Sequence, residues 1–471
     1  MYDHKFVPDP KGYPWHYNTS EEEQMREGFI QAATTVSNEE NLYRKDGSTL
    51  LAGIELELAL LTGDYKLATQ HMRDSVIQTV PNTSVELSAH QLEVVPSVPA
   101  DLKQDLLSLE TAMTQAVASV QLITRPMGLS WLRMGSYPLC HIHEVDYTKG
   151  EPKYIKYERS PQWHMANQRP SLEKYILTPA GPLDVSSGYV VGLMNALQVT
   201  VDSVNFDDAI DKLNRSFMIS PMTVALAAHA THLGYLNTGY SDVRFVTWRI
   251  SHDTRTDEEA EREFPTRVGL PAHYATGLND YFNQILSYPF VMNDPISLQY
   301  QFEVGNGIFW RDARLKFFRD KKTIGIEFRP VAVQPTLHED ISVVLFYIGR
   351  LLWSQNVGEQ LLPMELVWEN KESAMRLGMQ AKLHTQVNGK IVLLPATQAA
   401  GIEIERAEQG LALLESDAWK RLYFINTLRE RIEGGSPGER FVKTVNPIAR
   451  TIEEAGQNLI DAIEKRHLIE R

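Results

Sequence analysis

The chain has 471 residues, 43% hydrophobic and 23% charged, which is the composition of a globular protein with a large core. Its 60 acidic residues outnumber its 46 basic ones, and the resulting formal charge of −14 makes nucleic acid an improbable partner. No stretch is apolar enough to span a membrane, the first residues lack a signal-peptide pattern, and the single cysteine, Cys140, excludes an intramolecular disulfide, so we expect a cytoplasmic protein.

The first 50 residues read as an N-terminal arm and a helix. Proline, glycine and aromatic residues dominate up to Tyr17. Thr19 or Ser20, followed by three glutamates, then predicts a helix start, and the helix should run to about Thr35. Strands are expected at 51–61, within 84–95 and at 129–135, with a helix within 101–122.

The second half changes from mixed elements to helices. An irregular loop is expected over 152–182, followed by a strand at 195–203, helices at 207–230 and 272–286, and strands at 298–304, 308–318 and 323–333. Helices are then expected at 341–354, 371–383, 401–414, 419–433 and 449–466. Segregated strands and helices favour an α+β fold with a largely antiparallel sheet. We expect three parts: the arm and helix (1–50), a sheet-containing domain (51–337) and a helical C-terminal portion (338–471).

Two acidic pairs stand out among the expected strands. Glu55 and Glu57 share one face of the first strand, which is ordinary on a solvated surface but unfavourable in a cavity unless a cation lies between them. Glu86 and Glu93 are seven residues apart and would face opposite ways on one regular strand. They converge only if a bulge or turn falls near residues 88–90, which makes Glu93 the safer candidate. Carboxylates are the ligands that Mg²⁺ prefers.

A third constellation combines a carboxylate with cations. Glu327 and Arg329 share a strand face, and Arg314 lies on an expected neighbouring strand. The group could supply a metal ligand and cations that neutralise a phosphoryl group, or it could be a plain cross-strand ion pair.

Other motifs are weak or missing. Gly305-Asn-Gly307 lacks the third glycine of a dinucleotide fingerprint, and no phosphate-binding loop of the G-x-x-x-x-G-K-[ST] type occurs. Cys140-His-Ile-His143 has no partner set for a four-ligand zinc site.

Taken in order, the motifs resemble the glutamate–cysteine ligase family and its carboxylate–amine ligase relatives. Gly53-Ile-Glu55-Leu-Glu57 reproduces the family's G-x-E-x-E strand, and Glu93-Val-Val-Pro96 is similar to its second strand without the threonine. Gly135-Ser-Tyr137-Pro138 is similar to its G-x-x-P segment, with tyrosine where many members have histidine.

The resemblance continues to about residue 340. The strand with Gln198 and Thr200 is closer to the plant-type branch, and the stretch ending at Arg244 matches only in part because His232 interrupts the family pattern. Gly325-Ile-Glu327-Phe-Arg329 and the following Gln334-Pro-Thr336 give the most specific match. Arg314 takes the place of an upstream arginine, although leucine follows it here in place of proline.

The resemblance implies a glutamine synthetase-like fold, whose sheet lines the active site and carries helices on its outer face. It implies an ATP-dependent ligase that activates a carboxylate, usually the γ-carboxyl of glutamate, as an acyl phosphate and passes it to an amine. Two or more Mg²⁺ ions, replaceable by Mn²⁺, would be held by Glu55, Glu57, Glu93, Glu86 and Glu327.

The remaining site residues would act on the substrates. Arg329 and Arg314 would stabilise the transferring phosphoryl group, while Arg244, Gln198 and Thr200 would bind substrate. Partners would be small molecules, without nucleic acid or membrane, and the protein would be a monomer or a homo-oligomer. A non-catalytic relative that senses a metal–nucleotide or an amino acid is the alternative, because the chain departs from the family at Tyr137, Gln198, Thr200 and His232.

Overall fold

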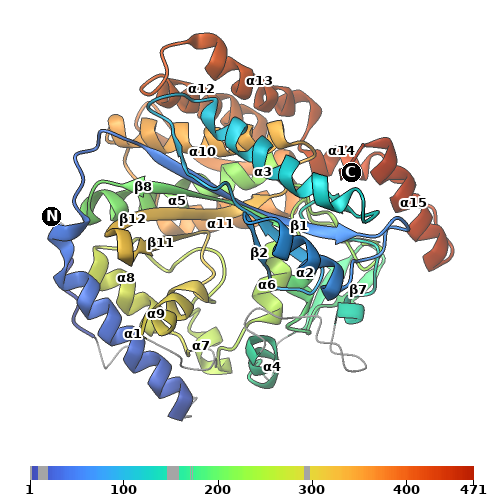
Figure 1. The fold of residues 1–471 in the computed structure, drawn as a ribbon, viewed down its shortest axis with the longest axis horizontal. Coiled ribbons are helices and arrows are strands. Elements are labelled where there is room, and N and C mark those ends of the chain that lie inside the picture. The colour runs from blue at the N-terminus through green and yellow to red at the C-terminus, as the bar shows by residue number, and fades with distance from the viewer. Residues whose placement is uncertain are drawn as a thin grey trace.

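A twisted, nine-stranded antiparallel sheet runs through the centre of the molecule (Figure 1). The computed structural model describes residues 3–8, 20–145, 159–169, 171, 173–290 and 298–470. The main path of the sheet is β11-β12-β8-β1-β3-β2, with β4 and β5 paired to β1, and β15 paired to β5. The strands are β1 (Leu51–Leu61), β2 (Thr83–Val85), β3 (Gln91–Val94), β4 (Ala100–Asp101), β5 (Ser130–Leu132), β8 (Ala196–Ser203), β11 (Ala313–Phe318), β12 (Thr323–Ala332) and β15 (Ile469–Glu470). The expected α+β class with a largely antiparallel sheet is confirmed.

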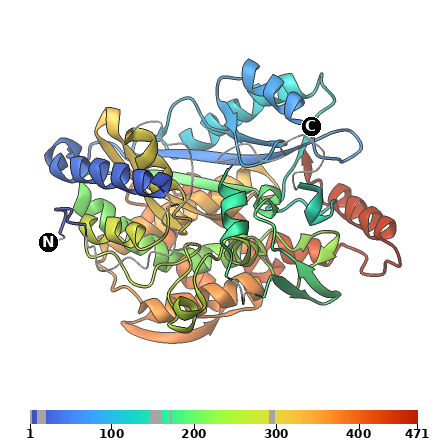
Figure 2. The ribbon, with the colours of Figure 1, turned by 90° about the horizontal axis from the view of Figure 1, so that it is seen from below.

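Helices surround this sheet. They are α1 (Ser20–Asn38), α2 (Gln70–Thr79), α3 (Ser108–Thr124), α4 (Arg159–Ala166), α5 (Phe206–Ala227), α6 (Arg244–Ser251), α7 (Asp257–Glu261), α8 (Leu278–Leu286), α9 (Leu298–Gly307), α10 (Leu337–Asn356), α11 (Met364–Leu377), α12 (Ala396–Leu411), α13 (Ala418–Gly434), α14 (Pro437–Val442) and α15 (Ile452–Lys465). Three small hairpins complete the fold: β6 (Tyr175–Thr178) with β7 (Gly181–Asp184), β9 (His232–Leu233) with β10 (Leu236–Asn237), and β13 (Lys382–Val387) with β14 (Lys390–Pro395). Figure 2 places α1 and α15 at opposite ends of the molecule.

The apolar face of the sheet forms the main core. Ile54, Leu56 and their neighbours alternate inward along β1 and are fully buried, and α3, α5 and α10 pack on this side. Phe328 of β12 stacks on Tyr347 of α10 with ring centroids 3.9 Å apart. The opposite face is therefore left to the polar residues that alternate with these side chains.

Two expected elements are wrong, each because tertiary packing outweighs a local pattern. Residues 298–304, expected as a strand, belong to helix α9, where Phe302 stacks on Phe29 of α1. The helix expected at 371–383 ends at Leu377, and the chain then enters the β13–β14 hairpin, which interrupts the helical C-terminal portion.

Most of the expected arm and the first residues of the expected loop at 152–182 lie outside the described residues. From residue 159 that loop contains α4 and the β6–β7 hairpin. The three-part division of the chain stays a prediction.

The helices of the described residues include none that is long and apolar enough to cross a membrane.

Buried histidines make stability depend on pH. Burial lowers the pKa of His229 and His232 to about 4 and that of His252 to about 3. Below the ordinary histidine pKa of about 6.5, the unfolded chain therefore takes up three protons that the folded chain does not bind. Asp340 has the opposite effect on stability. Burial raises its pKa to about 6, so below that pH the folded chain binds a proton that the unfolded chain does not. The net difference of about two protons should lower the free energy of unfolding by roughly 3 kcal/mol between pH 6 and pH 5.

Urea unfolding followed by tryptophan fluorescence at pH 7, 6 and 5 measures this loss. Replacing His229 by glutamine should reduce the slope, because the folded and unfolded states then no longer differ at that position. A free energy of unfolding that stays flat from pH 6 to pH 5 would contradict the prediction.

Candidate functional site

Most of the predicted site residues lie on one face of the sheet. In the strand register Glu57 faces Glu93, Glu55 faces Gln198, and Arg314 faces Glu327. Directly paired residues point to the same side of a sheet, and the side alternates along each strand. The carboxylates of β1 and β3 and the cations of β11 and β12 therefore lie on the face opposite the apolar core.

The turn between β2 and β3 brings in Glu86. The Gln91 amide donates to the Ser88 carbonyl, and the Gln91 side chain accepts from both the amide and the hydroxyl of Ser88. The chain therefore reverses near residues 88–90, which was the condition for Glu86 and Glu93 to converge. Both glutamates line the same cavity.

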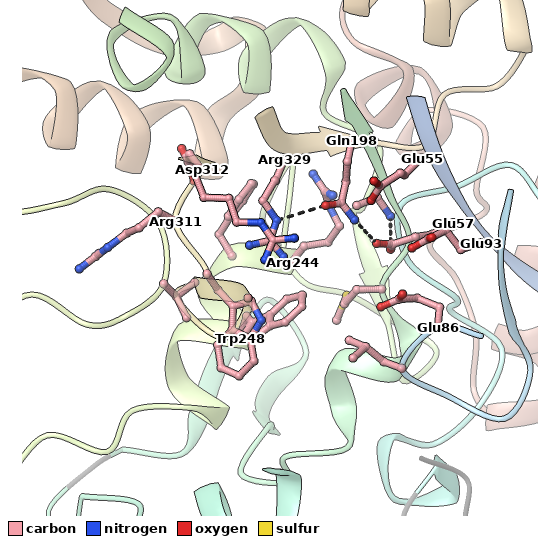
Figure 3. A pocket seen from close by; sticks show the side chains of 18 residues that line it. Glu55, Glu57, Glu86, Glu93, Gln198, Arg244, Trp248, Arg311, Asp312 and Arg329 are labelled. Atoms are coloured by element: carbon pink, nitrogen blue, oxygen red, sulfur yellow. Dashed lines mark hydrogen bonds between the residues drawn. The ribbon is translucent and has the colours of Figure 1, made fainter. Parts of the chain in front are cut away.

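The face opens into a cavity with an acidic and a basic side. Figure 3 shows four glutamates grouped on one side and the guanidinium groups of Arg244 and Arg329 facing them. Phe245, Trp248 and Trp310 add an aromatic wall that the sequence analysis missed, since no motif distinguished them from core residues. The acidic group consists of Glu55, Glu57, Glu86 and Glu93.

Glu57 is held in a fixed orientation. The Ala196 amide donates to one carboxylate oxygen and the Gln198 side-chain amide to the other, each at 2.7 Å. Arg329 Nε donates in turn to the Gln198 oxygen at 3.1 Å, and Figure 3 draws these bonds as one chain. Gln198 thus lies at the cavity wall, with its amide connecting the acidic side to the basic side.

Arg329 lines the cavity and has one unused donor. Its Nη1 is buried and has no hydrogen-bond partner among the described residues. Burial and the neighbouring Arg314 lower the pKa of Arg329 from its ordinary value, so this guanidinium lies where an anion would be favourable.

Glu327 is surrounded by cations. Its carboxylate is 0% exposed and contacts Arg314 Nε, Lys316 Nζ at 2.7 Å and Arg329 Nε at 3.5 Å. Burial alone would raise the pKa of Glu327, but Arg314, Lys316 and Arg329 outweigh it and hold that pKa well below its usual range. Unlike the other four predicted metal ligands, Glu327 does not line the cavity.

Lys316 is a further residue of the polar face that was not predicted from the sequence. It contacts both Glu327 and Glu55. Burial would lower the pKa of Lys316, but these two carboxylates raise it above its ordinary value, so the side chain is charged at neutral pH. The available signal was its position two residues after Arg314, which places both cations on one strand face.

Arg244 and Thr200 occupy different surroundings from those expected of substrate-binding groups. Arg244 begins α6 and donates to both oxygens of Asp242 and to the carbonyls of Pro330 and Val331, at the bulge in β12. Its guanidinium borders the cavity with most donors already used. Thr200 pairs with Gly53 and Glu327 within the sheet and is not part of the cavity wall.

The donor set suits a hard cation without forming a complete cage. Carboxylate oxygens are the ligands that Mg²⁺ takes up, together with several waters. Within the described part of the chain, no group of three or more histidine, cysteine, aspartate or glutamate side chains is arranged closely enough to hold a metal ion. The predicted roles of the ten site residues therefore stay predictions.

Comparison with solved structures identifies the fold. Glutamate–cysteine ligase from Francisella tularensis, solved in complex with AMP, matches with a TM-score of 0.58 at 12% identity, covering 90% of each chain. This likeness confirms the expected glutamine synthetase-like fold. A bifunctional glutathione synthetase from Pasteurella multocida matches at a TM-score of 0.47 and 10% identity, covering 94% of this chain and 54% of that one. The complex of the prokaryotic ubiquitin-like protein Pup with its ligase PafA matches at 0.37 and 12%, covering 90% and 76%.

Comparison with curated protein sequences found no match. The family model described as glutamate-cysteine ligase family 2, in contrast, matches residues 51–455, which include the whole polar face and every predicted site residue. Because this match extends over most of the sequence, the chain belongs to glutamate–cysteine ligase family 2.

Proposed function

We propose that the protein is an ATP- and Mg²⁺-dependent carboxylate–amine ligase that joins the γ-carboxyl of glutamate to the amine of an amino acid or a small amine. Family membership supports the ligase class. The single observation that carries the proposal is the cavity itself, in which four glutamates face the guanidinium groups of the β11–β12 side. One side suits a divalent cation with nucleotide phosphates, and the other suits a transferring phosphoryl group.

The reaction proceeds in two steps. An oxygen of the glutamate γ-carboxylate attacks the γ-phosphorus of ATP, the bond to ADP breaks, and an acyl phosphate forms. The amine nitrogen then attacks the acyl carbon, inorganic phosphate leaves with the bonding electrons, and the nitrogen loses a proton. Activation is needed because direct condensation of a carboxylate with an amine is unfavourable in water.

The chain's cations stabilise the charge that moves in the first step. Arg329 lines the cavity and has a buried Nη1 without a hydrogen-bond partner among the described residues, and Arg314 lies beside it on the neighbouring strand. Negative charge accumulates on the phosphoryl oxygens during transfer, so fixed guanidinium groups lower the barrier without having to reorganise. Gln198 keeps Arg329 at a set distance from Glu57.

The metal belongs on the acidic side. Glu57, Glu86 and Glu93 border the cavity from three positions of the β1–β3 unit, and one or two of them, with waters and nucleotide phosphates, would hold Mg²⁺ there. When bound, the ion offsets the repulsion between the ATP phosphates and the incoming carboxylate. Of the two other predicted ligands, Glu55 contacts Lys316, and Glu327 is engaged by three cations.

Coupled ADP release with ATP, Mg²⁺ and L-glutamate against a panel of amines tests the proposal. The panel should contain cysteine, other amino acids, simple alkylamines and aromatic amines, the last because Phe245, Trp248 and Trp310 form one wall. We expect ADP only with particular amines, together with a γ-glutamyl product of the correct mass. ATP binding without ADP release across all acids and amines would instead favour the non-catalytic sensor.

A further inference from the structure

Lys316 extends across the polar face to a strand that is not its neighbour. β12 and β8 separate β11 from β1 in the sheet, yet the Lys316 ammonium contacts Glu55 of β1 as well as Glu327 of β12. The residue directly paired with Lys316 is Gly325, which has no side chain to obstruct this path. The lysine thereby connects the acidic side of the cavity to the cations of β11 and β12.

The Lys316 ammonium lies between two carboxylates of the polar face. Glu55 and Glu327 come from different strands, and a positive charge between them reduces their mutual repulsion when both are ionised. The ammonium supplies that charge from within the chain, with Glu327 Oε1 at 2.7 Å. Glu327 also contacts Arg314 and Arg329, and its side chain does not line the cavity.

We propose that Lys316 takes the place of one metal ion, so that Glu55 and Glu327 bind the ammonium and Mg²⁺ is left with ligands from among Glu57, Glu86 and Glu93. This inference rests on the proposed function, because it concerns the ions that assist phosphoryl transfer. Because the Lys316 ammonium is part of the chain, its charge stays in the site throughout turnover and needs no metal from solution. Lys316 is accordingly a positioning residue for Glu55 and Glu327.

Counting bound Mn²⁺ by electron paramagnetic resonance, without nucleotide, tests the proposal directly. Lys316→Gln removes the charge and leaves Glu55 with an unpaired carboxylate, so this variant should bind one more Mn²⁺ per chain than the wild type. The double variant Lys316→Gln/Glu55→Gln should return to the wild-type count. An unchanged count in Lys316→Gln would overturn the proposal.

Lys45→Gln is the matched control. Lys45 is 24% exposed, against 25% for Lys316, and pairs with Asp202 of β8 at 3.1 Å, away from the cavity wall. Its removal should leave the Mn²⁺ count unchanged. Circular dichroism establishes that each variant is folded.

Glu55→Gln in the wild-type background supplies a second measurement that does not depend on the lysine variant. If Lys316 already neutralises Glu55, this change should leave the Mn²⁺ count as it is. Loss of one ion would show that Glu55 is a metal ligand and would overturn the proposal. That result would leave the ligase reaction standing, whereas a missing ADP signal with every amine would defeat the proposed function whatever the ion count.

Discussion

Replacing Glu57 by glutamine is expected to lower kcat by at least about 100-fold, since changes even in residues that only orient metal ligands cost 10- to 100-fold. The substitution keeps the shape of the side chain but removes its negative charge. The new glutamine amide group would also face two hydrogen-bond donors, the Ala196 backbone amide and the Gln198 side chain, which bind the carboxylate in the wild type. Mn²⁺ affinity should fall together with kcat.

The measurement is steady-state ADP release over a range of Mg²⁺ concentrations, with Mn²⁺ binding followed in parallel. Glu405→Gln, an exposed change on α12, is the control and should behave as wild type. Excess Mg²⁺ should restore only part of the rate, because one of the ligands is gone. Wild-type turnover and wild-type Mn²⁺ affinity in Glu57→Gln would remove this residue from the metal site.

The polar face could be predicted because strand alternation determines it locally. Glu55 and Glu57 alternate with Ile54 and Leu56, and the bounds of β1 agree with those expected. The condition placed on Glu86, a turn near Ser88, is also met. The family resemblance is confirmed as well, since its ordered motifs lie within the matched region.

Contacts between residues far apart in the chain could not be predicted from the sequence. The contact of Lys316 with Glu55 depends on how the sheet twists across two intervening strands, which no local pattern encodes. The pairing of Arg244 with Asp242, only two residues before it, was likewise not predicted, and the substrate-binding role of Arg244 stays a prediction. The β13–β14 hairpin was hidden because Lys371–Leu377 has helical spacing, and this pattern does not show where the helix ends.

The second large effect is expected at Arg329. Arg329→Lys keeps the positive charge but loses the planar fork, so the bond to Gln198 and the donor to the phosphoryl group can no longer come from separate nitrogens held in one plane. Removing one preorganised donor from a transition-state site typically costs about 10²–10³ in kcat, and we expect a loss of that size. KM for glutamate should change much less, since the lost interaction forms mainly as charge develops on the phosphoryl group.

Comparison with Arg314→Lys makes this prediction sharper. Arg314 directs its Nε at the buried carboxylate of Glu327, while Arg329 Nε binds Gln198 and lies farther from that carboxylate, at 3.5 Å. If Arg329 contacts the phosphoryl group directly, Arg329→Lys should reduce kcat more than Arg314→Lys does. Arg429→Lys, at a surface ion pair with Glu408, should leave kcat unchanged. A larger loss in Arg314→Lys than in Arg329→Lys would assign the direct contact to Arg314 and leave Arg329 as a link between Gln198 and Glu327.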